Sequence, residues 1–270
     1  MPFNVNGTTV ITNDGIVQLT SGVTGSRPAN PVTGQLFFDT TLNKLIAWSG
    51  NDWRLPTILN LTIPPSLRVW GQNNFGQLGD NSTTNRSSPV AVVGGFTNWV
   101  QIDSGGKHTT AIRADGTAWG WGENNKGQLG DNTIISKLSP VAVVGGFTDW
   151  IQISAGGEHT SAIRANGTAW GWGRNYKGQL GDGTDTEDNN RSSPVSVVGG
   201  FTDWVQISAG GTHTSAIRAN GTAWGWGLAT YGRLGSGSAS GNYESPVSIE
   251  GGFTDWVQIS AGFNHSAAIR

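Results

Sequence analysis

The chain has 270 residues, of which 36% are hydrophobic and 13% are charged, and its formal net charge at pH 7 is −2. This near-neutral balance without a basic stripe argues against nucleic acid as a partner, and the absence of cysteine excludes disulfides and thiolate metal sites. The 42 glycines and 13 tryptophans favour short strands joined by tight turns over a disordered chain. No stretch approaches the length of an apolar membrane span, and we see no secretory signal at the N-terminus.

Residues 1–60 predict a small β domain that is separate from the rest of the chain, residues 61–270. The segment TTVITNDGIVQL (8–19) predicts a hairpin around Asp14-Gly15. The segment GQLFFDTTLNKLIAWSGNDWRL (34–55) predicts a three-stranded meander. Because so short a domain buries little apolar surface alone, we expect it to pack on a partner or on copies of itself.

Part of this domain resembles a known module. Residues 27–53, RPANPVTGQLFFDTTLNKLIAWSGNDW, begin with Arg-Pro, continue with Gly-x-x-Phe-Phe-Asp-Thr and end an apolar strand with Trp-x-Gly before a closing Trp. This pattern resembles a short module that is common in bacteriophage virion proteins, especially tail fibres. The resemblance implies that residues 1–60 attach the chain to other virion proteins or hold copies of it together.

A repeat fills the remainder of the chain. GGFTNW begins at residue 94, and GGFTDW begins at residues 145, 199 and 251, so the repeat length is 51, 54 and 52 residues. The motif GQLGD recurs in the same phase in three of the four units. A period near 50 is typical of propeller blades and not of helical solenoids.

Each unit has the local signals of short antiparallel strands. WVQIDS (99–104) alternates apolar and polar residues, as a half-buried strand does. TTAIR and TAWGWG are joined by Ala-Asp-Gly or Ala-Asn-Gly, which supply the positive φ of a tight turn. SPVAVV (88–93) adds a further strand with proline near its start. We expect each unit to form one blade.

The ends of the repeat region are incomplete in complementary ways. SLRVWG (66–71) lacks an upstream partner strand, and NHSAAIR (264–270) lacks a downstream one. We therefore predict an all-β fold: a four-bladed β-propeller closed by pairing of the chain ends, with a small N-terminal β-meander domain. The same two arms can instead pair between chains in a strand-swapped oligomer, since the contacts would be identical.

The repeats also resemble a known family. The unit GGFTDWVQISAGGTHTSAIRANGTAWGWG (199–227) and the segment NNKGQLGDN (124–132) are similar to repeats of the regulator of chromosome condensation family, and the likeness covers residues 66–270. The resemblance implies a propeller built from such blades. Familiar members are usually seven-bladed, so four units depart from the pattern. The exchange-factor activity of one eukaryotic branch has no support in these residues.

Two groups of polar residues are candidates for metal binding. All four histidines share one repeat phase, so ring symmetry could bring them together at an axial metal or anion, although we favour a hydrogen-bonding role inside each blade: His108, His159, His213 and His265. A longer acidic loop carries Asp182, Asp185, Glu187 and Asp188. Its spacing does not follow a 12-residue calcium loop and favours a solvated insertion. We expect no metal and no cofactor.

Candidate binding residues lie where the near-identical repeats differ. One such place is QNNF, ENNK, RNYK and LATY, which begin at residues 72, 123, 174 and 228, and the other is the loop after Gln-Leu-Gly or its counterpart. Aromatic rings in these segments can stack on sugars or fill a partner's pocket. They are Phe75, Tyr176, Tyr231 and Tyr243. The alternative is that these loops vary because nothing constrains them.

Together these features predict a bacteriophage virion structural protein, a tail-fibre or appendage subunit assembled in the host cytoplasm. We expect a homo-oligomer that contacts other virion proteins through residues 1–60 and a host surface glycan or protein through its propeller. The alternatives are a capsid decoration protein and a non-viral propeller that acts as an interaction or inhibitor module. We expect no enzymatic activity, because neither G-x-S-x-G nor a Cys-His pair is present, and no membrane insertion.

Overall fold

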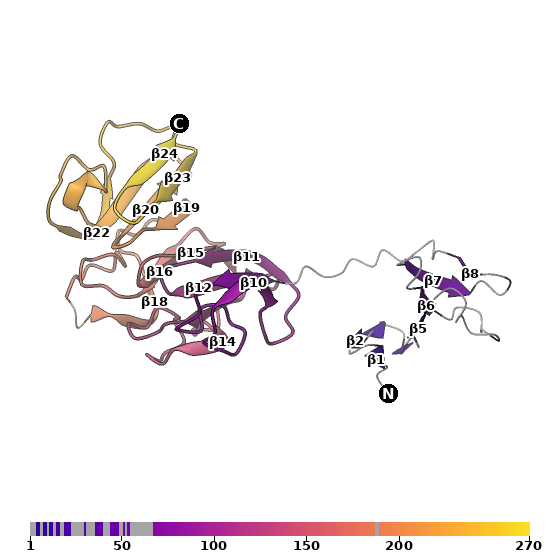
Figure 1. Cartoon of the computed structure of the whole chain (residues 1–270). Coiled ribbons are helices and arrows are strands. Elements are labelled where there is room, and N and C mark those ends of the chain that lie inside the picture. The colour runs from indigo at the N-terminus through magenta and orange to yellow at the C-terminus, as the bar shows by residue number, and fades with distance from the viewer. Residues whose placement is uncertain are drawn as a thin grey trace. The chain divides into compact units, whose positions relative to one another are not determined.

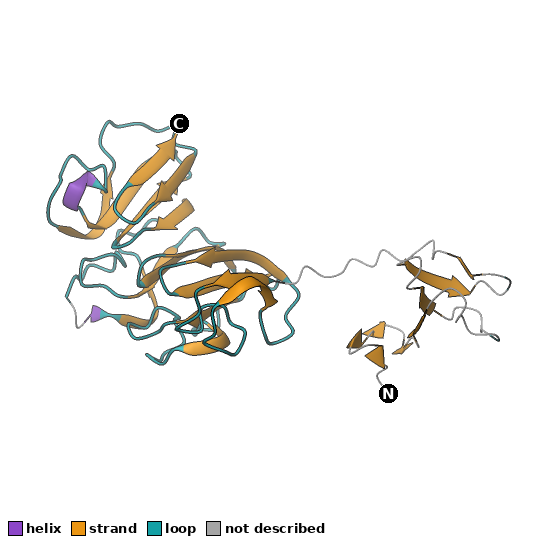
Figure 2. Ribbon diagram, viewed as in Figure 1, coloured by secondary structure: helices purple, strands orange, loops and turns teal. Residues whose placement is uncertain are grey.

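The computed structural model divides into two compact units, residues 1–62 and residues 63–270. It describes residues 67–186 and 189–270 and, in the first unit, the backbone of eight short strands together with Asn30 and Asn51. Strands dominate both units, and the short 3₁₀ turn η3 (Thr230–Gly232) lies in the second (Figures 1 and 2). No helix in these described parts is long and apolar enough to cross a membrane.

The described strands of the first unit form three small sheets. Their strands are β1 (Asn4–Val5), β2 (Thr8–Thr9), β3 (Ile11–Thr12), β4 (Gly15–Ile16), β5 (Leu19–Gly22), β6 (Leu36–Asp39), β7 (Lys44–Trp48) and β8 (Trp53–Arg54). β1 pairs with β2, β3 with β4, and the third sheet has the order β5-β6-β7-β8. Gly15 pairs with Thr12 inside β4, so it is a strand residue and not part of the predicted turn. β5 runs parallel to β6, which the predicted meander does not contain.

The second unit is a row of four-stranded blades with a half-blade at each end. The first half-blade is β9 (Arg68–Gly71) with β10 (Arg86–Ala91), and the last is β23 (Gln258–Ala261) with β24 (Ser266–Ile269). Blade 1 contains β11 (Trp99–Ser104), β12 (His108–Arg113), β13 (Ala118–Gly122) and β14 (Lys137–Ala142). Blade 2 contains β15 (Trp150–Ala155), β16 (His159–Arg164), β17 (Ala169–Gly173) and β18 (Arg191–Ser196). Blade 3 contains β19 (Trp204–Ala209), β20 (His213–Arg218), β21 (Ala223–Leu228) and β22 (Asn242–Ser248).

The turn between the second and third strands shows why the sequence requires glycine. Asp115 accepts hydrogen bonds from the Thr117 amide at 3.0 Å and from the Thr117 hydroxyl at 2.6 Å, which closes the turn before β13. Gly116 follows with a φ of +74°, a conformation that L side chains rarely adopt. A Cβ at this position would overlap the carbonyl oxygen of Thr148. The turn is therefore fixed both by its backbone angle and by contact with the segment that leads into the next blade.

The core lies between neighbouring sheets. Ile112 and Ala118 of blade 1 form one buried cluster with Trp150, Ile153 and Trp172 of blade 2, and the same arrangement recurs between blades 2 and 3. Each blade therefore buries its apolar faces only by contact with its neighbours, as expected for a repeat protein.

The tryptophan of each third strand reaches across this boundary. Trp121, Trp172 and Trp226 have no exposed surface. A Cβ on Gly130 would lie 2.9 Å from the indole nitrogen of Trp172, and Gly79 and Gly181 bear the same relation to the tryptophans of blades 1 and 3. Only glycine leaves room for the ring at these positions.

The predicted closure within one chain is not found. Among the described residues, β9 pairs only with β10 and β24 pairs only with β23, so residues 66–71 and 264–270 do not form a common sheet. Figure 1 shows β23 and β24 at one end of the second unit and β10 away from them. Neighbouring sheets pack through the third-strand tryptophans and the glycines of the preceding blade, and the units packed in this way form an open arc.

Two glycines with positive φ distinguish the effect of a close contact from the effect of backbone strain. Gly167 and Gly200 have φ values of +75° and +70°, but a Cβ on Gly167 would overlap the Thr202 carbonyl, whereas a Cβ on Gly200 would have no atom within 4 Å. We expect Gly167→Ala to lower the free energy of unfolding by about 1–3 kcal/mol more than Gly200→Ala does. Urea unfolding followed by tryptophan fluorescence measures both. Equal losses would show that the contact with Thr202 contributes nothing.

Candidate functional site

One cleft is built from the segments in which the repeats differ. The turn between the first and second strands carries Lys107 in blade 1, Glu158 in blade 2 and Thr212 in blade 3. The carbonyl oxygen of each accepts a hydrogen bond, at 2.9 to 3.0 Å, from the backbone amide that follows the third strand of the same blade or ends it. Variable side chains are thus held on a backbone frame that is the same in every blade.

The polarity of this frame changes from blade to blade. In blade 1, the Lys107 ammonium lies 3.6 Å from a carboxylate oxygen of Glu123. In blade 2 the charges are exchanged, since Arg174 pairs with Glu158. Blade 3 has no such ion pair at these positions, and there Thr212 accepts a hydrogen bond from Arg233 at 2.9 Å. The row of turns therefore presents a different polar group at each step.

Aromatic and basic side chains meet in the resulting cleft, which we call the binding cleft and which has a volume of about 570 Å³. Its lining includes Glu158, Arg174, Tyr176, Leu228, Arg233 and Phe263. The Arg174 guanidinium lies 3.9 Å from the centre of the Tyr176 ring, so this ring is fixed by a cation–π contact. Phe263 is largely exposed and contributes a second ring.

The structure places the four predicted aromatic residues in different surroundings. Tyr176 lines the binding cleft. Phe75 and Tyr231 do not line it, but each lies beside a cation that does: Lys107 is 4.7 Å from the Phe75 ring centre, and Arg233 is 5.6 Å from that of Tyr231. Tyr243 is part of β22, where it pairs with Gly227, and it is not among the lining residues.

Sequence reasoning missed Phe263, Arg174 and Arg233. A signal for Phe263 was present, because it replaces the second glycine of the Gly-Gly pair that precedes the equivalent turn in the other units. Arg174 belongs to the variable segment RNYK, in which a search for aromatic residues identifies only the tyrosine. Charged residues in such segments carry as much information as aromatic ones, since arginine is also frequent at binding hot spots.

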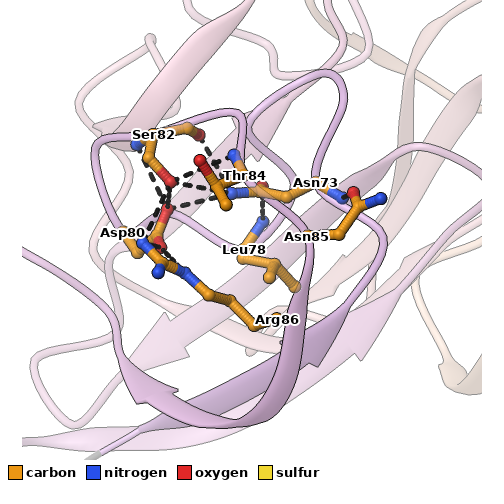
Figure 3. A network of polar contacts seen from close by, with 7 residues as sticks. All are labelled: Asn73, Leu78, Asp80, Ser82, Thr84, Asn85 and Arg86. Atoms are coloured by element: carbon orange, nitrogen blue, oxygen red, sulfur yellow. Dashed lines mark hydrogen bonds and ion pairs between the residues drawn. The ribbon is translucent and has the colours of Figure 1, made fainter.

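The loop after Gln-Leu-Gly is organised by a buried asparagine (Figure 3). Asn73 donates to Asp80 at 2.9 Å and to the Ser82 carbonyl at 3.0 Å, and it accepts from the Leu78 amide at 2.9 Å. Arg86 donates to Asp80 at 2.7 Å. Burial alone would raise the pKa of Asp80, but hydrogen bonds from Ser82, Arg86 and Asn73 outweigh it, so the pKa is lowered.

The same arrangement recurs around Asn124 and Asn175. These loops are therefore constrained at their base, which argues against free drift as the reason for their variation.

The acidic loop uses its first carboxylate in this way. Asp182 accepts from Asn175 at 2.8 Å and from Arg191 at 3.0 Å, so its oxygens serve the loop itself. Glu187 and Asp188 lie outside the described residues. Within the ranges that are described, no group of three His, Cys, Asp or Glu side chains could hold a metal ion.

The histidines connect one blade to the next. The Nε2 atoms of His108 and His159 lie 2.9 Å from the hydroxyls of Thr160 and Thr214, and His213 bonds to Ser266 in the same way. The Thr160 hydroxyl donates to the Gln128 carbonyl at 2.8 Å, so it accepts from His108, whose Nε2 must carry the proton. The expected hydrogen-bonding role is thus correct in kind, but the partner lies in the neighbouring blade.

Burial lowers the pKa of these histidines. The pKa of His108 falls to about 4, and that of His159 falls to about 3 because burial is joined by repulsion from His213 and His108. The pKa of His213 falls to about 4 through burial and the nearby charge of Arg233. Burial therefore keeps these three histidines neutral near pH 7.

The fold and the site together define a β-propeller-type repeat protein whose blades share one frame and differ at their connecting segments. A family model described as the regulator of chromosome condensation (RCC1) repeat matches residues 69–112, 115–163, 166–217 and 220–269. The chain therefore belongs to the RCC1 repeat family.

Relatives and solved structures show how far this likeness extends. The ultraviolet-B receptor UVR8 of Arabidopsis thaliana is 30% identical over 217 residues, which are 78% of this chain and 48% of the receptor. Human WBSCR16 has a TM-score of 0.67 at 20% identity, over 83% of this chain and 55% of the other. Yeast RCC1 (Prp20), solved bound to Kap60, has a TM-score of 0.65 at 18% identity, over 95% and 60%. The chain thus spans about half the length of UVR8.

Neutral histidines make stability depend on pH. Below pH 6.5 the unfolded chain binds protons at His108, His159 and His213, whereas the folded chain does not until pH falls to about 4 or 3. The contribution of these histidines to the free energy of unfolding is therefore fully present above pH 6.5. It is lost as pH falls, by up to about 1.4 kcal/mol per pH unit for each histidine. Urea unfolding between pH 7.5 and 5.5 measures this slope before most carboxylates titrate.

The variant His159→Gln keeps a hydrogen-bond donor and cannot titrate, so it should reduce the slope by about a third. A wild-type free energy of unfolding that stays constant between pH 7.5 and 5.5 would contradict the assignment of three buried neutral histidines.

Proposed function

We propose that the RCC1-repeat unit is a binding module that uses the binding cleft. The observation that carries this proposal is the coincidence of three features: a cleft, a rigid shared backbone and the positions at which the repeats differ. In repeat proteins, differences confined to connecting segments commonly mark the binding face. The combination of Tyr176, Arg174 and Phe263 suits a protein surface or a sugar, since aromatic rings and guanidinium groups contribute strongly to both kinds of contact.

The chemistry of the cleft favours binding over catalysis. Glu158 is the one carboxylate among its lining residues, and it is paired with Arg174. A glycoside hydrolase of the common type needs two carboxyl groups on either side of the scissile bond.

We further propose that the whole chain is a bacteriophage virion structural protein, a tail-fibre or appendage subunit. The resemblance of residues 27–53 to a module of virion proteins supports this role, as does the division of the chain into a small unit and a larger one. On this proposal, residues 1–60 attach to other virion proteins and the binding cleft contacts a host surface glycan or protein. A capsid decoration protein would use the same attachment without a receptor, and a non-viral interaction module would use only the cleft.

Binding of the full chain to host cell envelopes tests both parts of the proposal. We expect co-sedimentation with envelopes of a susceptible bacterium, and Tyr176→Ala or Arg174→Ala should weaken it at least tenfold, since loss of a hot-spot side chain costs about 2 kcal/mol. Tyr243→Ala is the matched control, because Tyr243 lies outside the cleft, and it should bind as the wild type does.

Phage particles that lack this protein provide the second arm. If the chain attaches to particles but to no envelope, the decoration role is correct and the receptor role is wrong. If it binds envelopes but not particles, the virion role fails. Unchanged envelope binding by both cleft variants would place the contact elsewhere on the chain.

A further inference from the structure

The two half-blades are complementary parts of one blade. In blades 1 to 3 the strand order is first, second, third, fourth, and the equivalents of the third and fourth strands form the first half-blade, β9 and β10. The equivalents of the first and second strands form the last half-blade, β23 and β24. Among the described residues, the free edge of β9 therefore corresponds to the edge that a second strand covers, and the free edge of β24 corresponds to the edge that a third strand covers.

The complete blades define how these edges would pair. In blade 1, His108 pairs with Gly122, Ala111 with Trp119 and Ile112 with Ala118, and blades 2 and 3 repeat this register. The equivalent pairs join His265 to Gly71, Ala268 to Arg68 and Ile269 to Leu67. No residue must be inserted or deleted in either strand for the full ladder to form.

At one end of the arc, a third-strand tryptophan is not buried against a preceding blade. The third-strand tryptophans of the complete blades are fully buried, but their equivalent Trp70 is 63% exposed. It projects from β9, the strand that has no second-strand neighbour.

The matching site lacks its tryptophan at the other end. Gly235 is equivalent to Gly79, Gly130 and Gly181, but a Cβ there would meet the Ile249 side chain at 3.1 Å and no aromatic ring. A cleft lined by Leu234, Gly235, Trp256 and Ala268 lies beside it. The equivalents of Gly235, Trp256 and Ala268 in the complete blades pack around the buried tryptophan there.

Isoleucines at the two ends of the arc are complementary in the same way. Ile269 of β24 is 56% exposed and Ile102 of β11 is 40% exposed, whereas their equivalents Ile112 and Ile153 are buried against one another between blades 1 and 2. A second cleft, lined by Leu67, Trp70, Ile102 and Thr109, lies between the first half-blade and blade 1. This cleft occupies the place that the first and second strands of a complete blade would fill. The strands β23 and β24 of the last half-blade are equivalent to these two strands.

The polar groups that bond complete blades to one another are also present at the two ends of the arc. The amides of Ile153, Ile207 and Ile259 each donate to a glutamine side chain of the preceding sheet, at 3.0, 2.9 and 2.7 Å. The last half-blade carries the equivalent Gln258, and blade 1 carries the equivalent Ile102 amide. Likewise His265 is the equivalent of His108, and Thr109 is already oriented by donating to the Gln77 carbonyl at 2.8 Å, as Thr160 is to Gln128.

We propose that two copies of the chain join head to tail, so that the last half-blade of each completes the first half-blade of the other. Each copy supplies three complete blades and half of each of two composite blades, which makes a closed ring of eight blades. The contact is between different surfaces of the two copies, and a two-fold rotation closes it. Among the described residues, one copy forms an open arc whose two end sheets have two strands each, so both of their free edges are available to a second copy.

Disulfide formation tests the pairing and shows whether it occurs between copies. The natural chain has no cysteine, so introduced thiols have no competitor. Arg68→Cys and Ala268→Cys place thiols directly opposite one another in the proposed register, within the Cα separation that a disulfide tolerates. Both residues are exposed in one copy, so neither substitution disturbs a core.

The two single variants of the full chain are co-expressed and oxidised. We expect a covalent dimer on non-reducing electrophoresis, and none when Arg68→Cys is combined with Ala267→Cys, whose side chain points to the other face of β24. If the two cysteines form a disulfide only when both are in one chain, the ring closes within a single copy and the proposal is overturned. If no disulfide forms in either arrangement, the arc stays open, which also overturns it.

The tryptophan contact provides an independent readout. Trp70→Ala added to the Arg68→Cys chain should lower the yield of covalent dimer at least tenfold, because the ring would no longer fill the site beside Gly235. Ile135→Ser is the matched control, since Ile135 is equally exposed but lies in a loop of blade 1 far along the chain from both half-blades. An undiminished yield with Trp70→Ala would contradict the proposed insertion. This readout does not depend on whether residues 1–60 hold copies together, because the disulfide reports only the composite blade.

Discussion

The arrangement of the second unit depends on the contact between a tryptophan of one blade and a glycine of the blade before it. Four short strands cannot bury two faces alone, so each blade acquires a core only from its neighbours. The ring of Trp172 occupies the space that a side chain at Gly130 would need, and this fixes how closely two sheets approach. The bonds from His108 to Thr160 and from Ile153 to Gln101 then fix their register at the same boundary.

This division of roles explains why the face of the arc can vary. Lys107, Glu158 and Thr212 occupy one position of the frame and differ in charge, yet their carbonyl oxygens make the same hydrogen bond. All three line the binding cleft, whereas third-strand tryptophans and the glycines after Gln-Leu make the contact between blades. Substitutions at this position therefore change the chemistry of the cleft with little effect on the packing of the blades.

The sequence predicts local structure well because the local signals are repeated. The alternation in residues 99–104 identified β11, and the Ala-Asp-Gly turn correctly separated β12 from β13. The shared phase of the histidines was visible, but their partners were not, since a period shows which residue recurs and not which sheet it faces. Ring closure failed for the same reason: the angle between sheets is a property of packed side chains, and no single repeat contains it.

The candidate site was only partly predictable. Tyr176 was predicted because it is an aromatic residue in a variable segment. Phe263 belongs to a segment that differs from its equivalents only by the replacement of one glycine, so the same criterion did not identify it. Tyr243 was misplaced because the fourth strand of blade 3 begins earlier than expected, so the residue became part of β22. Predicting such a site requires knowing where each strand ends, and that is decided by neighbouring blades.

The last half-blade is already folded as its complete counterparts are. Arg270 donates to both oxygens of Asp255 at 2.7 and 3.1 Å, and its guanidinium lies 3.7 Å from the centre of the Phe253 ring. Arg164 and Arg218 make the same pair of contacts inside blades 2 and 3. A half-blade with its native hairpin and ion pair in place loses little conformational freedom when strands are added to its edge. Ile269 is exposed at this edge, whereas its equivalents Ile112, Ile163 and Ile217 are buried, so a partner that covers it gains free energy from apolar surface that is already in place.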